Sequence, residues 1–212
     1  MKYNTAKQVE LDALQFRASD HRYTLHGVVV PSVTQALDSL NPNAWWPSDK
    51  LEEARLRGTL VHKLTEIADQ GGDWYEDAIE TQLVDYIHAW ETFKHDFKVT
   101  ILESEQRVYH TKHRYSGTFD RILAVPLTSS PYVVDIKTGE EHSQYAIQLA
   151  AYSKAASEMQ QSRYNLEHRA VVQLNSDATY KFIEYPAKEL NQDFEVFLAA
   201  LTIHNWRAAR HG

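Results

Sequence analysis

The sequence has no cysteine among its 212 residues. This absence excludes disulfides, thiolate zinc sites and cysteine-bound iron–sulfur clusters. The chain also lacks any run of about 18 apolar residues and shows no signal-peptide pattern at its N-terminus. We therefore expect a soluble, intracellular protein without membrane contact, whose fold is held by packing alone.

The sequence has fewer basic residues than acidic ones. The chain has 22 lysines and arginines against 29 acidic residues, for a net charge of −7. This balance argues against a broad basic surface that grips nucleic acid non-specifically. It is compatible with a local basic groove, or with an acidic site neutralised by bound metal. The apolar fraction of 43% is sufficient for a hydrophobic core, and the length fits a single domain over residues 1–212.

Periodicity and turn residues divide the chain into elements that predict an α/β fold. Residues 1–47 are expected to form an N-terminal extension, with a hairpin over 16–30, a short helix that Ser32 caps, and a loop. Helices are predicted over 48–70, 76–97, 142–160 and 187–210, and strands over 99–109, 115–125, 132–137, 168–174 and 179–185. This order indicates one mixed sheet flanked by helices.

Two of the predicted strands, FDRILAV (119–125) and YVVDIK (132–137), are joined by the loop PLTSSP. A symmetric fold-back would pair Asp120 with Lys137 and put Asp135 on the same face, with the two carboxylates roughly 5–8 Å apart. Charged residues in an apolar strand are costly unless they are paired or bound to metal. The hairpin therefore predicts a divalent-metal site, and a surface ion pair is the alternative.

Three further groups of polar residues could contribute to such a site. His62 lies on a predicted helix, where an imidazole is a common metal ligand. Glu103 and Glu105 alternate along a predicted strand with Arg107 and share its face, so spacing does not choose between the two glutamates. Gln148 and Tyr152 lie four residues apart on a helix, where their polar atoms could hold a phosphate or orient a ligand.

Five segments follow one another along the chain: GTLVH (58–62), SEQRVY (104–109), GTFD (117–120), VDIKTG (134–139) and QLAAY (148–152). In this order they resemble the PD-(D/E)XK nuclease superfamily, in its RecB-like and phage-exonuclease-like branch. The resemblance implies a restriction-endonuclease-like αβββαβ core flanked by helices, which agrees with the elements predicted from residue 48 onward. It implies no iron–sulfur cluster here, because the cysteines that bind one in several relatives are absent.

The resemblance also implies roles for individual residues. His62, Asp120 and Asp135 become metal ligands, with the Ile136 backbone carbonyl as a further one, for one or two Mg²⁺ or Mn²⁺ ions. The implied catalytic residues are Lys137, Asp120, Asp135 and Glu105. The family has an acidic residue on this strand, and Glu105 matches its position better than Glu103 does. Gln148 and Tyr152 would help to hold the DNA.

The implied function is metal-dependent hydrolysis of DNA by an exonuclease in phage DNA recombination, repair or processing. The alternatives are a structure-specific or restriction-like endonuclease, and an inactive nuclease fold that serves as a DNA-binding module. The expected partners are DNA and either further copies of the chain or a recombination protein, in the cytoplasm of a bacterial or phage-infected cell.

Basic and aromatic residues near these segments could contact DNA. Arg55 and Arg57 precede GTLVH, and Arg114 lies in a predicted turn near the strands of the site, so we expect a local basic rim that engages phosphates. The adjacent Trp45 and Trp46 could stack on an unpaired terminal base. A place in the core or at an interface is the favoured alternative for both tryptophans.

Overall fold

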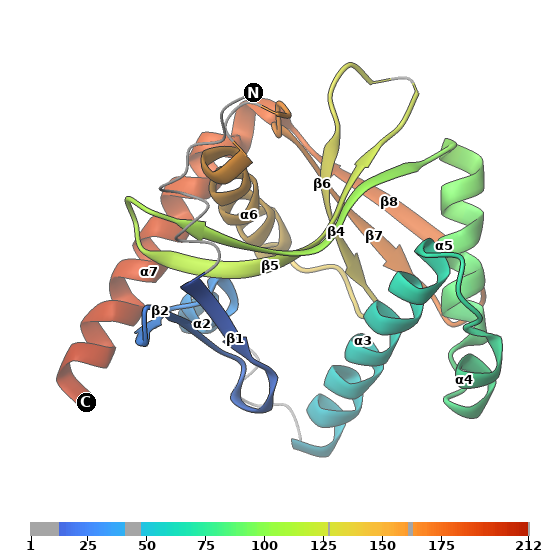
Figure 1. The fold of residues 1–212 in the computed structure, drawn as a ribbon, viewed down its shortest axis with the longest axis horizontal. Coiled ribbons are helices and arrows are strands. Elements are labelled where there is room, and N and C mark those ends of the chain that lie inside the picture. The colour runs from blue at the N-terminus through green and yellow to red at the C-terminus, as the bar shows by residue number, and fades with distance from the viewer. Residues whose placement is uncertain (1–12, 41–47, 127, 161–162, 212) are drawn as a thin grey trace.

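The computed structural model describes residues 13–40, 48–126, 128–160 and 163–211. At its centre is a five-stranded sheet in the order β4-β5-β6-β7-β8 (Figure 1). The strands are β4 (Thr100–His110), β5 (Tyr115–Ala124), β6 (Tyr132–Lys137), β7 (His168–Leu174) and β8 (Tyr180–Tyr185). Only the β6–β7 pair is parallel among these neighbours. Helix α6 (Gln144–Gln160) forms the crossover between β6 and β7, as a parallel connection requires.

Helices cover both faces of this sheet. One apolar cluster joins α6 and α7 (Leu190–His211) to the sheet, and a second joins α3 (Ser48–Asp69) and α5 (Val84–Phe97) to the opposite face. In β6, Val133 belongs to the first cluster, while Val134 and Ile136 belong to the second. The prediction of a mixed sheet flanked by helices is confirmed. No helix in the described ranges is long and apolar enough to cross a membrane.

The single helix predicted over 76–97 is wrong, because the chain forms α4 (Tyr75–Glu80) and then α5. Gln82 has a left-handed backbone with φ +59°. The Leu83 amide donates to the Ala78 carbonyl at 2.8 Å and the Gln82 amide to the Ile79 carbonyl at 3.1 Å. This is the hydrogen-bond pattern of a helix C-terminus that normally uses glycine, and it brings Leu83 into the core.

The N-terminal segment is a three-stranded antiparallel sheet rather than the predicted hairpin. Its strands are β1 (Leu14–Arg17), β2 (Arg22–Leu25) and β3 (Val28–Val30). The predicted Ser32 cap is confirmed, since the Ser32 hydroxyl accepts from the Gln35 amide at 3.1 Å before α2 (Val33–Leu37). The predicted loop with Trp45 and Trp46 lies outside the described residues.

The β5–β6 hairpin has a different register from the one predicted. Arg121 pairs with Val134, and the same register continued by one residue sets Asp120 across from Asp135 instead of Lys137. The connecting turn begins directly after β5, where the Thr128 amide donates to the Val125 carbonyl at 3.2 Å. Because the error is two residues, the side chains stay on the predicted face.

A buried ion pair ties the sheet to the helices on one of its faces. Arg121 of β5 has no exposed surface, and its Nε donates to Asp69 Oδ2 of α3 at 2.7 Å. The other oxygen of Asp69 accepts from Trp90 Nε1 at 2.9 Å and from Lys94 Nζ at 2.8 Å, both on α5. One carboxylate therefore joins a strand and two helices.

We expect Asp69→Ala to lower the free energy of unfolding by about 3–5 kcal/mol, because it leaves a buried guanidinium without its partner. Glu91→Ala is the matched control. Glu91 also bonds Lys94, at 2.8 Å, but its side chain is 42% exposed, so we expect a loss of less than about 1 kcal/mol. Urea unfolding of both variants provides the comparison, and equal losses would contradict the proposed importance of the Asp69 network.

Candidate metal centre

Three side chains from three elements converge at one point of the structure. His62 comes from α3, Glu105 from β4 and Asp120 from β5. His62 Nδ1 lies 3.2 Å from Asp120 Oδ1 and 3.8 Å from Glu105 Oε1. One ligand atom from each residue lies within 4.8 Å of the other two. An imidazole and two carboxylates at this spacing form a donor set for a divalent cation.

An irregularity in β4 aims Glu105 at this point. Glu105 has φ +49°, a left-handed conformation that is strained for a residue with a side chain. In the β4–β5 ladder Ser104 pairs with Arg121 and Gln106 pairs with Phe119, while Glu105 between them is not paired. On the opposite strand, Phe119 and Ile122 both pack in the α6–α7 cluster although they are three residues apart. The alternation of β5 therefore slips near Asp120, opposite Glu105, although the pairing keeps one register on both sides of it; the register shift of this strand pair lies earlier in β4, between Ile101 and Glu103.

The backbone irregularities of β4 separate Glu105 from Glu103. Glu103 pairs with Ile122, which packs in the α6–α7 cluster, and its Oε1 accepts from Arg163 Nη1 at 2.8 Å. The prediction that Glu103 shares a strand face with Glu105 is wrong, because it assumed unbroken alternation. Of the two glutamates that spacing left open, Glu105 is the one near His62.

Asp120 and His62 form an ion pair. Asp120 is 6% exposed, and its Oδ2 accepts from the Ile136 amide at 2.6 Å. Burial acts to raise the pKa of Asp120, but the charges of His62 and Lys137 and the Ile136 hydrogen bond hold that pKa well below its usual range. Burial acts to lower the pKa of His62, but Asp120 and Glu105 raise it to about 10. A proton therefore resides on the imidazole between the two carboxylates.

A second pair, Lys137 with Asp135, lies beside the first on β6. Lys137 Nζ forms an ion pair with Asp135 Oδ2, and the ammonium lies 5.1 Å from the ring centre of Tyr145 on α6. Asp135 is 2% exposed. Burial raises its pKa to about 7, with Asp120 acting in the same direction and Lys137 against it. Asp135 thus carries a proton part of the time near neutral pH.

Gln148 and Tyr152 face each other on α6, as their spacing predicted. Gln148 Nε2 donates to the Tyr152 hydroxyl at 3.2 Å. Gly117 of β5 packs directly against this pair, and a Cβ atom added there would lie 2.6 Å from Tyr152 Cε1. The glycine at the start of GTFD therefore lets the aromatic ring approach the strand.

The two pairs and the α6 residues open into one cavity of about 560 Å³. Its walls come from the N-terminal sheet, α3, the strands β4 to β6 and α6. Arg55 lines it but bonds Glu52, with 2.6 Å between Nη2 and Oε1. Arg57 and Arg114 do not line the cavity. Arg57 Nε donates to Thr138 Oγ1 at 3.4 Å, and Arg114 lies in the β4–β5 turn with φ +54°.

Arg121 is the main site residue that sequence reasoning missed. Its Nη1 donates to Glu105 Oε1 at 3.0 Å and to the Asp120 carbonyl at 2.8 Å. It thus holds one carboxylate of the centre and the backbone of the other. The signal was present, since Arg121 lies inside the apolar strand FDRILAV, where an unpaired charge is costly.

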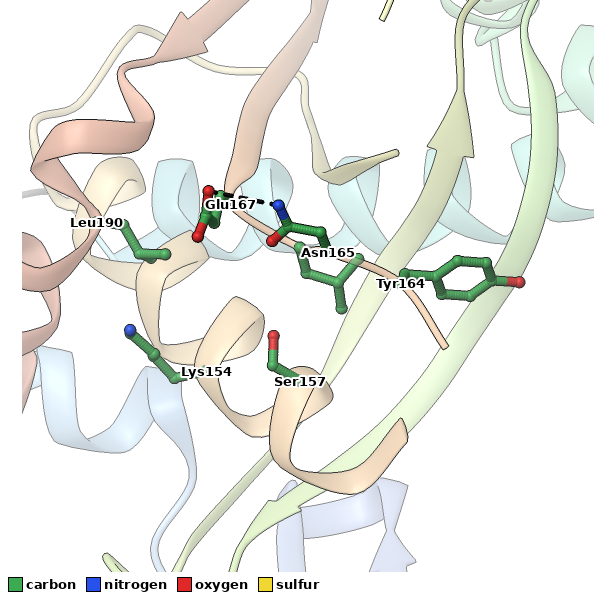
Figure 2. Close-up of a pocket in the computed structure, with 7 residues that line it drawn as sticks. Lys154, Ser157, Tyr164, Asn165, Glu167 and Leu190 are labelled. Carbon is green, nitrogen blue, oxygen red and sulfur yellow. Dashed lines mark hydrogen bonds between the residues drawn. The ribbon is translucent and has the colours of Figure 1, made fainter. Parts of the chain in front are cut away.

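A separate cleft of about 440 Å³ lies between α6 and the segment leading into β7 (Figure 2). Lys154 lines it, and its Nζ donates to Asn191 Oδ1 at 2.7 Å. Across the cleft, Asn165 Nδ2 donates to Glu167 Oε2 at 3.4 Å. Among its lining residues Glu167 is the one carboxylate and there is no histidine, so this cleft offers no counterpart to the cluster around His62.

Comparison with known proteins places the chain in a family. The family model of the PD-(D/E)XK nuclease superfamily matches residues 68–211, which is more than half of the chain. The match includes Glu105, Asp120, Asp135 and Lys137, and it begins after His62. No curated protein matches. The five-stranded mixed sheet and its flanking helices agree with the restriction-endonuclease-like fold that was expected, and proteins of this kind typically bind divalent metal ions. The chain belongs to the PD-(D/E)XK nuclease superfamily.

Proposed function

We propose that the chain is a metal-dependent DNA exonuclease of the RecB-like or phage-exonuclease-like branch, acting in DNA recombination or repair. The observation that carries this proposal is the convergence of His62, Glu105 and Asp120 beside the Lys137–Asp135 pair. Members of the superfamily are metal-dependent nucleases, and these five side chains provide both cation ligands and a positive charge for a phosphodiester.

The donor set fits one or two Mg²⁺ or Mn²⁺ ions. Carboxylate oxygens suit both ions, and the imidazole of His62 favours Mn²⁺. Asp135, which lies across from Asp120, adds a further carboxylate to this set of metal ligands. The Ile136 amide points at Asp120, and in a strand the carbonyl of the same residue points to the same side, so we include that carbonyl among the ligands. When bound, the metal lowers the pKa of a water molecule and polarises the phosphate.

The remaining residues of the cavity take supporting roles in this proposal. Lys137, held by Asp135, orients the attacking water or stabilises the charge of the transition state. Water adds to phosphorus and gives up a proton, the bond to the leaving oxygen breaks, and that oxygen takes up a proton, so that no net proton is consumed. Gln148 and Tyr152 contact the DNA, and Arg55 contributes a positive charge at the cavity wall.

Two features support action at DNA ends by an active enzyme. Asp120 and Asp135 are almost completely buried at a cavity, which a free end enters more easily than an interior bond. Glu105 is kept in a strained backbone conformation that turns it toward His62, and such strain is typical of working sites. The second feature disfavours an inactive DNA-binding module.

The central test is digestion of end-labelled linear DNA and circular DNA with Mn²⁺ or Mg²⁺. We expect the linear DNA to be degraded and the circular DNA to persist, whereas an endonuclease would cut both. Lys137→Ala should lower kcat by about 100- to 1,000-fold, since it removes a charge aimed at the transition state.

Lys181→Ala is the matched control for that variant, because Lys181 is exposed on β8 away from the cavity. It should cleave like the wild type. Undiminished cleavage by both Lys137→Ala and Asp135→Ala would sink the assignment of the site.

Metal binding should strengthen as pH rises. His62 must lose its proton to bind a cation, and its pKa of about 10 means that metal displaces that proton throughout the neutral range. Asp135, with a pKa of about 7, adds to proton release below neutrality. We expect Mn²⁺ affinity, measured by calorimetry between about pH 6 and 8.5, to rise about tenfold per pH unit above neutrality, where His62 alone releases a proton, and more steeply below it, where Asp135 releases a second.

The variant His62→Gln tests how much the imidazole contributes to Mn²⁺ affinity and to its pH dependence. It should bind Mn²⁺ more weakly at high pH and with a flatter pH dependence, because glutamine has no proton to lose. A wild-type affinity that is independent of pH would contradict the proposal that His62 is a ligand.

A further inference from the structure

An aromatic cluster on the N-terminal sheet lines the same cavity as the proposed metal centre. It consists of Phe16 on β1, His21 in the turn that follows, and Tyr23 on β2. The ring centroids of Phe16 and Tyr23 are 4.6 Å apart, and those of Phe16 and His21 are 5.0 Å apart in an edge-on arrangement. Tyr23 is buried, Phe16 is half-buried and His21 is exposed, so the cluster presents aromatic surface that the core does not cover.

This cluster, the aromatic wall, is fixed to the strands that carry the site. The Tyr23 hydroxyl lies 2.8 Å from Thr118 Oγ1, two residues before Asp120 in β5. Arg107 Nη1 of β4 donates to the Leu14 carbonyl of β1 at 3.1 Å. A wall attached to both β4 and β5 holds a constant position relative to the carboxylates of the centre.

The cavity size and burial of the carboxylates limit which phosphate can reach them. A volume of about 560 Å³ is within the range of sites for small ligands, which suits a nucleotide and excludes a paired duplex. Asp120 and Asp135 are 6% and 2% exposed. A phosphate that reaches them therefore belongs to a strand whose neighbouring bases have left the helix.

The lysines and arginines that line the cavity are Arg55, Lys63 and Lys137, and two of these three are held by carboxylates. Arg55 is engaged by Glu52, and Lys137 by Asp135. Base stacking is an attraction that does not depend on charge, and it is tolerant of sequence because every base has a π face. The aromatic wall can supply it next to an acidic centre that repels phosphate until metal binds.

We propose that the ring of Phe16, with His21 beside it, stacks on an unpaired nucleobase next to the scissile phosphate. This inference rests on the proposed nuclease function and extends it to the substrate. The enzyme accordingly acts on single-stranded DNA or frayed ends in preference to blunt duplex, because a paired base must first leave its stack.

The test compares kcat/KM for a labelled single strand and for the blunt duplex of the same sequence, with Mn²⁺. Wild type should favour the single strand by about tenfold or more. Phe16→Leu keeps apolar packing but removes the π face, and it should lose about tenfold, mainly through a higher KM. Phe16→Tyr should retain activity, as should Tyr75→Ala, which removes a half-exposed aromatic on α4 outside the cavity.

A second measurement detects stacking without cleavage. A single strand with 2-aminopurine at its end, bound to Lys137→Met in Mn²⁺, should lose fluorescence through stacking, and the added change Phe16→Leu should restore it. Equal cleavage of both DNA forms, or quenching that is indifferent to Phe16→Leu, overturns the stacking proposal. Wild type that cleaves no DNA in any form instead overturns the proposed function, and the quenching still decides whether the wall binds a base.

Discussion

The buried guanidinium of Arg121 is the constraint on which the rest of the structure depends. It pairs with Asp69 of α3, which in turn holds Trp90 and Lys94 of α5. The same guanidinium bonds the Glu105 carboxylate and the Asp120 carbonyl. Taking these charges out of water is costly, and the arrangement is stable only while every partner is present. The network that holds the helices to the sheet therefore also holds the acidic centre, and the two cannot be altered independently.

Charge balance explains how a folded chain tolerates this centre before a cation binds. Protonated His62 neutralises Asp120, and Lys137 lies against Asp135, whose raised pKa leaves it only partly charged near neutrality. Two carboxylates that share a site repel each other, and protonation of one relieves that repulsion. The proposed divalent metal replaces a proton on His62, so its binding adds one net positive charge to the acidic centre instead of two.

The sequence predicted most accurately those parts that local patterns determine. The bounds of β6 and β7 agree with prediction, because both are short segments that contain adjacent valines and are buried on both faces. Asp120 meets His62, and Asp135 stays on the same face as Asp120 although the hairpin register was wrong, since a slip of two residues preserves the face. The left-handed backbone of Glu105 and the turn at Gln82 could not be foreseen. Neither position has the glycine that signals such a conformation, and tertiary contacts impose both.

The N-terminal segment was expected to be an extension of the nuclease core, and its contacts give it a larger part. Strands β1 and β2 fasten to β4 and β5 through Leu14 and Tyr23, and they contribute a wall of the cavity. The superfamily match begins at residue 68, so this wall precedes it, while Asp120, Asp135 and Lys137 lie within it. In the proposed enzyme, the carboxylates and the lysine act on the phosphate, and the wall acts on the base. Because stacking contributes binding without entering the chemistry of hydrolysis, substitutions in the wall can change which DNA is cleaved while leaving the cleavage step intact.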